Sequence, residues 1–553
     1  MTGKKMSMSG GGESCTYTYD SLGRLLSETQ TGNILKEYRY DAANNLKQSR
    51  ILHNGIEISN TGYTYDNLNR MAHVYEKGEL KATYTYDSNG NRQSLTYANG
   101  ISIQYEYNLA NKLIILTNKQ GATTISSYSY TYFSDGNQEK KIDWTGKTTT
   151  YGYDGLGRLI SEEATGGETI LYAYYDSSNR MSMTAGEKTT IYAYDRNNRL
   201  ITETTGENTI TYAYDGNGNQ IAKETGGEIT INKYDGFNRL KKQIQGSNNA
   251  EYEYNGDGLR TKKTVNAEET RQIWIGKQIV CELDAADVAK AVFIRGINLI
   301  YAEMEGLQTY YVYNGHGDVV QLIDESGTLT KTYEYDAFGV EKDADEEDIN
   351  PFRYCGEYFD KETGTYYLRA RYYNPAIGRF ITEDSYPGDP RDPLSLNLYI
   401  YAYNNPIMYT DPTGHAPEWV NSILNFFGIG PKIHVGSETI HVNVDVGYRY
   451  VSEAEYQFIK QNGYIPNTDI NGNPKDVYVS TNKYNGISDA ESGLQIGAKN
   501  PNGATQSPKY RVEFKLNSVK YNYMGNVQGG TGVELTTKEK IIVDTKKNNT
   551  AQK

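Results

Sequence analysis

Short segments in which tyrosine alternates with other residues recur along residues 15–260. Tyr17–Leu25 (YTYDSLGRL) returns in altered form as Tyr63–Met71 (YTYDNLNRM) and as Tyr151–Leu159 (YGYDGLGRL). Successive units lie 20 to 25 residues apart, and a period of this length is typical of repeat architectures. The second tyrosine of the unit stands at positions 19, 40, 65, 86, 107, 132, 153, 174, 194, 214, 234 and 254.

Each unit predicts a β-hairpin. The Tyr-x-Tyr pattern has period two, which is typical of a strand that presents aromatic rings on one face. The Asp that follows and the Gly or Asn after it favour a turn, and a second strand rich in Thr and Glu comes next, as in Arg199–Gly206. Because one hairpin cannot bury its own face, we expect neighbouring units to stack into a continuous sheet.

The tyrosine rows allow two interpretations. In the first, they are the buried wall of a structural β-repeat, where each ring buries roughly 150–250 Å². In the second, they are an exposed platform that binds carbohydrate.

Composition supports a folded protein and disfavours several function classes. The 553 residues include 53 Tyr and 55 Gly, and 12% of the chain is aromatic, whereas disordered chains are poor in aromatic residues. A net charge of −13 disfavours electrostatic binding of the whole chain to nucleic acid or anionic lipid. No run of about 18 apolar residues is present, so we expect no membrane span. Residues 1–10 lack the apolar stretch of a signal peptide.

The cysteines and histidines form no recognisable cluster in the sequence. Cys15, Cys281 and Cys355 are far apart and odd in number, and the six histidines are scattered. Neither a disulfide framework nor a metal site follows from these spacings. The sequence therefore predicts no metal site.

The repeats resemble the Tyr-Asp (YD) units of the Rhs family of bacterial polymorphic toxins, over residues 15–415. The more specific motifs, similar to the Rhs-associated core, are Tyr333–Gly339 (YEYDAFG), Asn350–Tyr354 (NPFRY), Gly364–Phe380 (GTYYLRARYYNPAIGRF), Asn397–Pro406 (NLYIYAYNNP) and Asp411–Gly414 (DPTG). The resemblance implies a spiral β-sheet cocoon that the core closes at one end. It also implies a variable C-terminal toxin inside.

The same resemblance implies self-cleavage directly after Gly414, with Arg371, Asp384 and Asp411 as the residues involved. Such chemistry needs two nearby carboxyls, one neutral and one ionised, and an Arg can orient one of them. One departure is His415, because the family often has Leu or Trp after the Gly. The alternative is that residues 411–414 form only a tight turn.

Residues 416–553 are a region of different character. They carry 15 Lys and Arg and 13 Asp and Glu, a net charge of +2, which leaves −15 on the first 415 residues. An acidic shell and a slightly basic tail suit a container and its cargo. We expect an α+β fold with a short helix at 419–427, a capped helix at 452–463, and strands at 440–446, 476–482, 510–516, 533–535 and 541–543.

The order of these elements resembles the ADP-ribosyltransferase toxins. They have a Tyr-Arg pair on a first strand, here Tyr448 and Arg449, and a later strand that ends in Ser or Thr, here Ser480 and Thr481. A Gly-rich segment followed by a Glu, here Glu534, completes the order. The resemblance implies NAD as the substrate, bound by Tyr448, Arg449 and Ser480.

The resemblance also implies a role for each residue. Arg449 would hold the NAD diphosphate or ribose, since a guanidinium binds phosphate through two hydrogen bonds. Ser480 and Thr481 would support the nicotinamide pocket. Glu534 would bind the ribose hydroxyls and stabilise the positive charge that builds as nicotinamide leaves. Ser480, Thr481 and Glu534 are thus the implied catalytic residues.

Other interpretations of the tail stay open. Many family members have a second Glu or Gln at the position of Gly532, and this second group helps to choose the residue that accepts ADP-ribose. The acceptor therefore stays open. Glu513 on the neighbouring strand competes with Glu534 for the catalytic role. A nuclease tail would need His with acids or a metal, and only His434 and His441 follow position 415. A structural or adhesive surface protein with an inert tail is the third alternative. Arg449 is then a surface charge.

The expected organisation has six parts. Residues 1–14 are a disordered start, 15–265 YD repeats, 266–415 repeats and core, 416–435 a linker, 436–545 the toxin domain and 546–553 a tail. The implied partners are a secretion apparatus, a cognate immunity protein, and a protein or nucleic acid of a competitor cell. We expect delivery by secretion or from the cell surface. A start within a repeat, without an export module, is typical of a C-terminal piece or a silent cassette.

Overall fold

The computed structural model describes residues 4–10, 12–389 and 392–415, and then the strands β38 to β47. The chain divides into two compact units, Gly3–Ile423 and Leu424–Lys553, which are described separately. In the described residues the helical elements are three short 3-10 turns, and none of them could cross a membrane.

The first unit contains one sheet of 32 strands in chain order, each antiparallel to the next. Its first half comprises β1 (Ser7–Gly10), β2 (Glu13–Tyr19), β3 (Leu25–Gln30), β4 (Ile34–Tyr40), β5 (Leu46–His53), β6 (Ile56–Tyr65), β7 (Met71–Glu76), β8 (Glu79–Tyr86), β9 (Arg92–Tyr97), β10 (Ile101–Tyr107), β11 (Leu113–Gln120), β12 (Thr123–Tyr132), β13 (Gln138–Asp143), β14 (Thr148–Tyr153), β15 (Leu159–Ala164) and β16 (Thr169–Tyr174).

The second half continues in the same way, so the predicted mainly-β fold of stacked hairpins is confirmed. Its strands are β17 (Arg180–Ala185), β18 (Lys188–Tyr194), β19 (Leu200–Thr205), β20 (Asn208–Tyr214), β21 (Gln220–Thr225), β22 (Glu228–Tyr234), β23 (Leu240–Gln245), β24 (Asn248–Tyr254), β25 (Arg260–Val265), β26 (Glu268–Ile275), β27 (Gln278–Leu283), β28 (Ala289–Arg295), β29 (Leu299–Met304), β30 (Leu307–Tyr313), β31 (Val319–Asp324) and β32 (Leu329–Thr332).

The Asp of a typical unit caps the turn that follows the tyrosine strand. Asp195 Oδ1 accepts hydrogen bonds from the backbone N–H of Asn197 and of Arg199, at 2.9 and 3.0 Å. Its Oδ2 accepts from Arg199 Nε at 2.6 Å. Asn198 has a φ of +63°, a conformation that Asn and Gly tolerate best. This geometry explains the Asp-x-x-Gly/Asn-Arg spacing of the repeat.

The two tyrosines of a unit have different tasks. The second one binds the preceding hairpin: the Tyr174 hydroxyl donates to the Leu159 carbonyl at 2.7 Å, and the Arg158 guanidinium lies over the Tyr174 ring. The first one is buried in nearly every unit, for example Tyr151, Tyr172 and Tyr192. These first tyrosines are therefore part of the buried wall and do not form an exposed carbohydrate platform.

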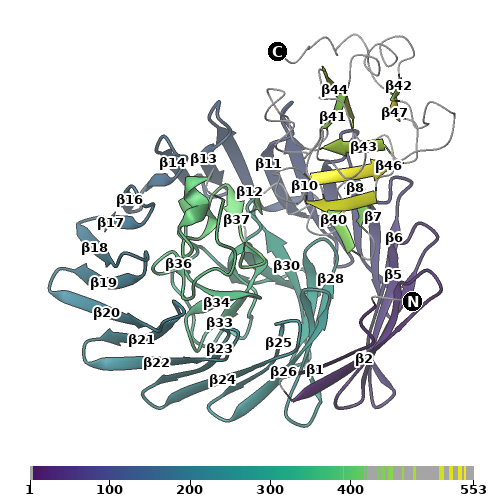
Figure 1. Ribbon diagram of the computed structural model, residues 1–553, viewed down its shortest axis with the longest axis horizontal. Coiled ribbons are helices and arrows are strands. Elements are labelled where there is room, and N and C mark those ends of the chain that lie inside the picture. Colours follow the sequence, from purple (N-terminus) through teal and green to yellow (C-terminus); the bar gives the residue numbers. More distant parts are fainter. Residues whose placement is uncertain are drawn as a thin grey trace, which may run out of the picture. The chain divides into compact units, whose positions relative to one another are not determined.

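The sheet curls so that late strands lie against early ones (Figure 1). Lys36 Nζ donates to the Trp274 carbonyl at 2.8 Å, and the Tyr97 hydroxyl donates to the Tyr311 carbonyl at 2.7 Å. The contact therefore joins residues more than 200 positions apart. The first unit is a spiral sheet.

The segment that follows β32 lies within the curve of the sheet (Figure 1). Arg260 of β25 forms a fully buried ion pair with Asp360, and the Tyr399 hydroxyl donates to the Gly218 carbonyl at 2.9 Å. These contacts fix the segment to the inner side of the wall. Its elements are η1 (Tyr354–Gly356), β33 (Tyr358–Asp360), β34 (Thr365–Leu368), β35 (Arg371–Asn374), β36 (Arg379–Phe380), η2 (Pro393–Leu396), η3 (Ala402–Asn404) and β37 (Tyr409–Thr410).

Two local expectations are wrong. The expected disorder over residues 1–14 does not extend to residues 7–10 and 12–14, because β1 pairs with β2 in an antiparallel hairpin. Trp419, expected in a helix, belongs to β38 (Glu418–Trp419) and pairs with Tyr409. Residues 420–427 of that helix and all of the expected helix 452–463 lie outside the described residues.

The second unit is described by its strands alone. A sheet has the order β40-β39-β45-β46-β43-β41-β44, and β42 pairs with β47. The bounds are β39 (Lys432–Val435), β40 (Glu438–His441), β41 (Val446–Val451), β42 (Tyr464–Ile465), β43 (Val477–Ser480), β44 (Tyr510–Lys515), β45 (Asn522–Asn526), β46 (Val533–Thr537) and β47 (Ile541–Ile542).

Candidate self-cleavage site

The hairpin of β34 and β35 holds the segment that ends at Gly414. Arg369 Nη1 donates to the Pro412 carbonyl at 2.8 Å, and the Ala370 N–H donates to the Thr413 carbonyl at 3.3 Å. Arg369 sits at this turn with a φ of +61°. Sequence reasoning did not single out Arg369, although it belongs to the same motif as Arg371.

Gly414 is required by close packing. Its φ is +74°, and a Cβ at this position would lie 2.6 Å from the Leu368 carbonyl oxygen and 3.0 Å from the Arg371 nitrogen. Any other residue would push the segment away from the hairpin. The glycine thus allows the Gly414–His415 peptide bond to lie against β34 and β35.

Arg371 contacts both candidate carboxylates and the peptide bond after Gly414. Its Nε donates to the Gly414 carbonyl, and its Nη2 lies 2.7 Å from Asp384 Oδ2 and 3.6 Å from Asp411 Oδ2. Its Nη1 donates to the Leu398 carbonyl at 2.9 Å. The structure therefore brings the three predicted residues together at the predicted bond.

The two carboxyls differ in surroundings. Asp411 is almost completely buried, and its Oδ1 accepts from the N–H of Gly414 at 2.8 Å and of His415 at 3.1 Å. Burial raises the pKa of Asp411 above its usual range, although Arg371 opposes this. Asp384 forms the close ion pair with Arg371, and its Oδ1 lies 3.0 Å from His415 Nδ1.

This arrangement can support peptide hydrolysis. A guanidinium at the carbonyl oxygen can stabilise an oxyanion, and a neutral carboxyl beside the amide nitrogen can supply a proton. The alternative prediction of a turn describes part of the same geometry, because Asp411 does cap a turn with Gly414 at positive φ. A turn alone does not account for the buried Arg371 and Asp384.

The described strands of the second unit align most of the predicted tail residues. Ser480 of β43 pairs with Glu534 of β46 on one side and with Tyr448 of β41 on the other, and Tyr448 pairs with Glu513 of β44. These four positions form one row across the sheet. Arg449 is one position beyond the row, and Thr481 lies outside the described residues.

Comparison with known families accounts for the first unit. Residues 136–407 match the Teneurin YD-shell family, and residues 82–123 match the RHS Repeat family. Both stretches lie in the spiral sheet and the segment within it. The first unit therefore has the fold of a YD-repeat shell. The candidate cleavage bond after Gly414 lies shortly beyond the matched residues.

Two relatives are similar over short stretches. The chain is 39% identical over 170 residues to the tRNA3(Ser)-specific nuclease WapA of Bacillus spizizenii. The matched residues are 29% of this chain and 7% of the relative. It is 37% identical over 102 residues to the toxin protein Tse5 of Pseudomonas aeruginosa, 18% of this chain and 7% of that protein. The chain therefore covers less than a tenth of the length of these two relatives.

Solved structures share the shell fold. A Photorhabdus luminescens Tc holotoxin pore structure (mutation TccC3-D651A) has a TM-score of 0.50 at 19% identity, over 73% of this chain and 21% of that chain. The TcdB2-TccC3 crystal structure has a TM-score of 0.50 at 20% identity, over 73% of this chain and 22% of that chain. Identities this low establish the fold alone.

Proposed function

We propose that the chain is an Rhs-type toxin whose YD shell encloses a C-terminal effector and cuts the chain after Gly414. The observation that carries the proposal is the convergence of Arg371, Asp384 and Asp411 on the Gly414–His415 peptide bond. This bond lies shortly before the boundary between the two compact units at residues 423 and 424. Relatives named as a toxin and as a nuclease support the toxin class.

The proposed cleavage gives each group a separate role. Asp384, ionised beside Arg371, takes a proton from a water molecule as the water oxygen attacks the Gly414 carbonyl carbon. Arg371 stabilises the negative charge that forms on the carbonyl oxygen. The bond to the His415 nitrogen then breaks, and neutral Asp411 donates a proton to that nitrogen. The products are a carboxylate at Gly414 and an amine at His415.

For the effector we propose ADP-ribosyltransferase activity with NAD as its substrate. The row of Tyr448, Ser480 and Glu534 across three adjacent strands supports this, because it places residues from distant parts of the sequence at one level of the sheet. In this proposal Glu534 stabilises the charge on the ribose as nicotinamide leaves, and Arg449 binds the diphosphate. Ser480 and Thr481 support the nicotinamide.

The proposed biological setting is competition between bacteria. The effector would act on a protein or nucleic acid of a competitor cell, after delivery by a secretion apparatus or from the cell surface. A cognate immunity protein would protect the producer. Support for this setting comes from the relative named toxin protein Tse5 and from the YD shell itself.

Transfer of a label from NAD tests the effector proposal. We expect the purified chain to transfer labelled ADP-ribose from NAD to a component of a bacterial lysate. Glu534→Gln should bind NAD but transfer ADP-ribose about 10²–10³-fold more slowly, whereas Arg449→Ala should mainly raise the NAD requirement.

The matched control is Glu513→Gln, which removes the competing carboxylate of the same row. Undiminished transfer by Glu534→Gln and none by Glu513→Gln would reassign the catalytic role to Glu513. Degradation of RNA or DNA without consumption of NAD would contradict the proposal and favour the nuclease alternative.

A further inference from the structure

One turn of the shell inverts the polar pattern of the repeat. A typical unit has Asp first and Arg or Asn fifth, but the turn between β30 and β31 has Asn314 first and Asp318 fifth. Asn314 Oδ1 still caps the turn, since it accepts from the N–H of His316 at 2.9 Å and of Asp318 at 3.1 Å. The carboxylate has therefore moved to the end of the turn, where Asp318 Oδ1 lies 2.8 Å from His316 Nδ1.

Cys355 of η1 faces this turn from the inner segment. Its N–H donates to Asp318 Oδ1 at 2.9 Å, and its Sγ lies 3.9 Å from His316 Nδ1. Its φ is +54°, a conformation that a non-Gly residue seldom adopts. The backbone is thus held so that a thiol, an imidazole and a carboxylate meet, with the three ligand atoms within 4.8 Å of one another.

The spacing of these atoms is close to that of a tetrahedral metal site. Zinc bonds of about 2.0–2.3 Å to N, O and S place neighbouring ligand atoms roughly 3.3–3.6 Å apart. The observed 2.8 Å between His316 Nδ1 and Asp318 Oδ1 is the shorter distance of a direct hydrogen bond. Asp318 Oδ2 also accepts from Asn314 Nδ2 at 2.7 Å, the kind of outer contact that orients a metal ligand.

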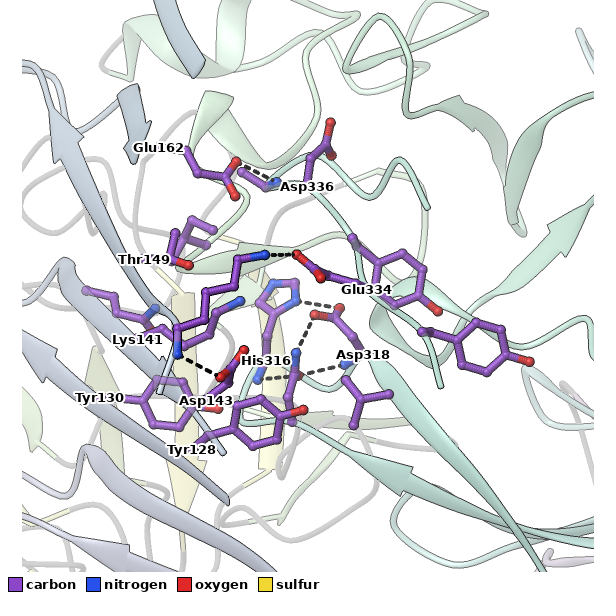
Figure 2. Close-up of a pocket in the computed structure, with 18 of the residues that line it drawn as sticks. Tyr128, Tyr130, Lys141, Asp143, Thr149, Glu162, His316, Asp318, Glu334 and Asp336 are labelled. Carbon is purple, nitrogen blue, oxygen red and sulfur yellow. Dashed lines mark hydrogen bonds and ion pairs between the residues drawn. The ribbon is translucent and has the colours of Figure 1, made fainter. Parts of the chain in front are cut away.

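His316 and Asp318 also line a cavity of about 190 Å³ in the shell (Figure 2). Carboxylates dominate its charged lining, with Asp143, Glu162, Asp318, Glu334 and Asp336 against two lysines, Lys141 and Lys147. Such a lining attracts cations and provides a path to the cluster. His316 Nε2 is buried and has no hydrogen-bond partner, so the ring has an unused polar atom here.

We propose that His316 Nδ1, a carboxylate oxygen of Asp318 and the Cys355 thiolate bind one divalent cation of the zinc class. On binding, the thiol proton leaves to solvent and the imidazole carries its proton on Nε2. Three protein ligands leave the fourth position to a water from the cavity. Because Cys355 belongs to the inner segment and the other two ligands to the wall, the ion ties the segment to the shell.

Titration of the metal-stripped full chain with Co²⁺ tests this site. We expect about one equivalent to produce a thiolate-to-cobalt charge-transfer band, and Zn²⁺ to displace it. Cys355→Ser should abolish the band, and His316→Gln should weaken binding at least tenfold. The matched controls are Cys15→Ala and His73→Gln, which lie elsewhere in the shell and should leave the band unchanged.

Two results would overturn the proposal: no band at excess Co²⁺, or a band that survives Cys355→Ser. Should Cys355→Ser not fold, alkylation of the unaltered chain decides the question. Zn²⁺ should slow modification of Cys355 at least tenfold, and an unchanged rate would contradict the site. Residues 416–553 contain no cysteine, so a thiolate band cannot arise from the effector region.

Discussion

At the scale of single residues, Asp411 and Asp384 carry the same carboxyl group, but their different surroundings suit one to the role of acid and the other to the role of base. Asp411 is almost completely buried, which favours its neutral form although two backbone N–H groups donate to it, whereas Asp384 faces the Arg371 guanidinium at 2.7 Å. Burial raises the pKa of Asp411, so its neutral form persists to a higher pH than that of an ordinary Asp. One acid and one base are therefore available at the same pH.

The first prediction is that self-cleavage slows as the pH rises through the pKa of Asp411. Above that pKa the carboxyl is ionised and cannot protonate the leaving nitrogen. The measurement is the rate of appearance of the two fragments after refolding at a series of pH values. Histidine also changes charge near neutral pH, so His415→Leu is the control. If the cleavage rate of that variant no longer falls as the pH rises, the fall is caused by His415 and not by Asp411.

The second prediction concerns the half-buried capping residue Asp336. Its Oδ1 accepts from the N–H of Phe338 and Val340, but no Arg follows, and burial together with Glu162 raises its pKa to about 7. An unfolded chain ionises this group at lower pH, so its contribution to stability falls as the pH rises from about 4 to about 7. Asp336→Asn keeps the acceptor and should raise the free energy of unfolding by roughly 1–2 kcal/mol at pH 8.

The comparison for Asp336→Asn is Asp195→Asn. Asp195 has an Arg partner, and hydrogen bonds with Arg199 lower its pKa despite partial burial, so this variant should lose stability at pH 8. Urea unfolding at pH 8 and pH 4 measures both variants. An equal gain from Asp336→Asn at the two pH values would contradict the explanation.

At the scale of the hairpin, much of the shell follows from the sequence. All twelve second tyrosines of the recognised units end a strand, as alternation and turn chemistry predict. The periodicity does not predict contacts between turns of the spiral, such as Lys36 with Trp274, because it relates only neighbouring units. The cluster at His316 and Cys355 was missed for the same reason, since the chain brings these residues together over 39 positions.

The third prediction separates the two tyrosines of one unit. Tyr174→Phe removes the hydroxyl that donates to Leu159 and leaves that carbonyl without its donor, so we expect a loss of about 1 kcal/mol. Tyr172→Phe is the matched control, because the Tyr172 hydroxyl is buried and has no partner. Its removal should be neutral or stabilising. Equal losses in thermal or urea unfolding would contradict the assigned roles.

At the scale of the whole molecule, the candidate cleavage bond lies in the first unit, shortly before the boundary with the C-terminal unit. The hairpin of β34 and β35, the required Gly414 and the three polar residues all belong to the first unit. The shell thus carries every group that the proposed cleavage needs. The product of the proposed cleavage is an effector region that begins at His415.

The mass of the purified protein tests this central claim most directly. We predict that mass spectrometry of the unaltered chain shows two fragments, one that ends at Gly414 and one that begins at His415. Asp384→Asn and Asp411→Asn should each give a single chain of 62.2 kDa. A single intact chain of 62.2 kDa from the unaltered, folded protein would contradict the account.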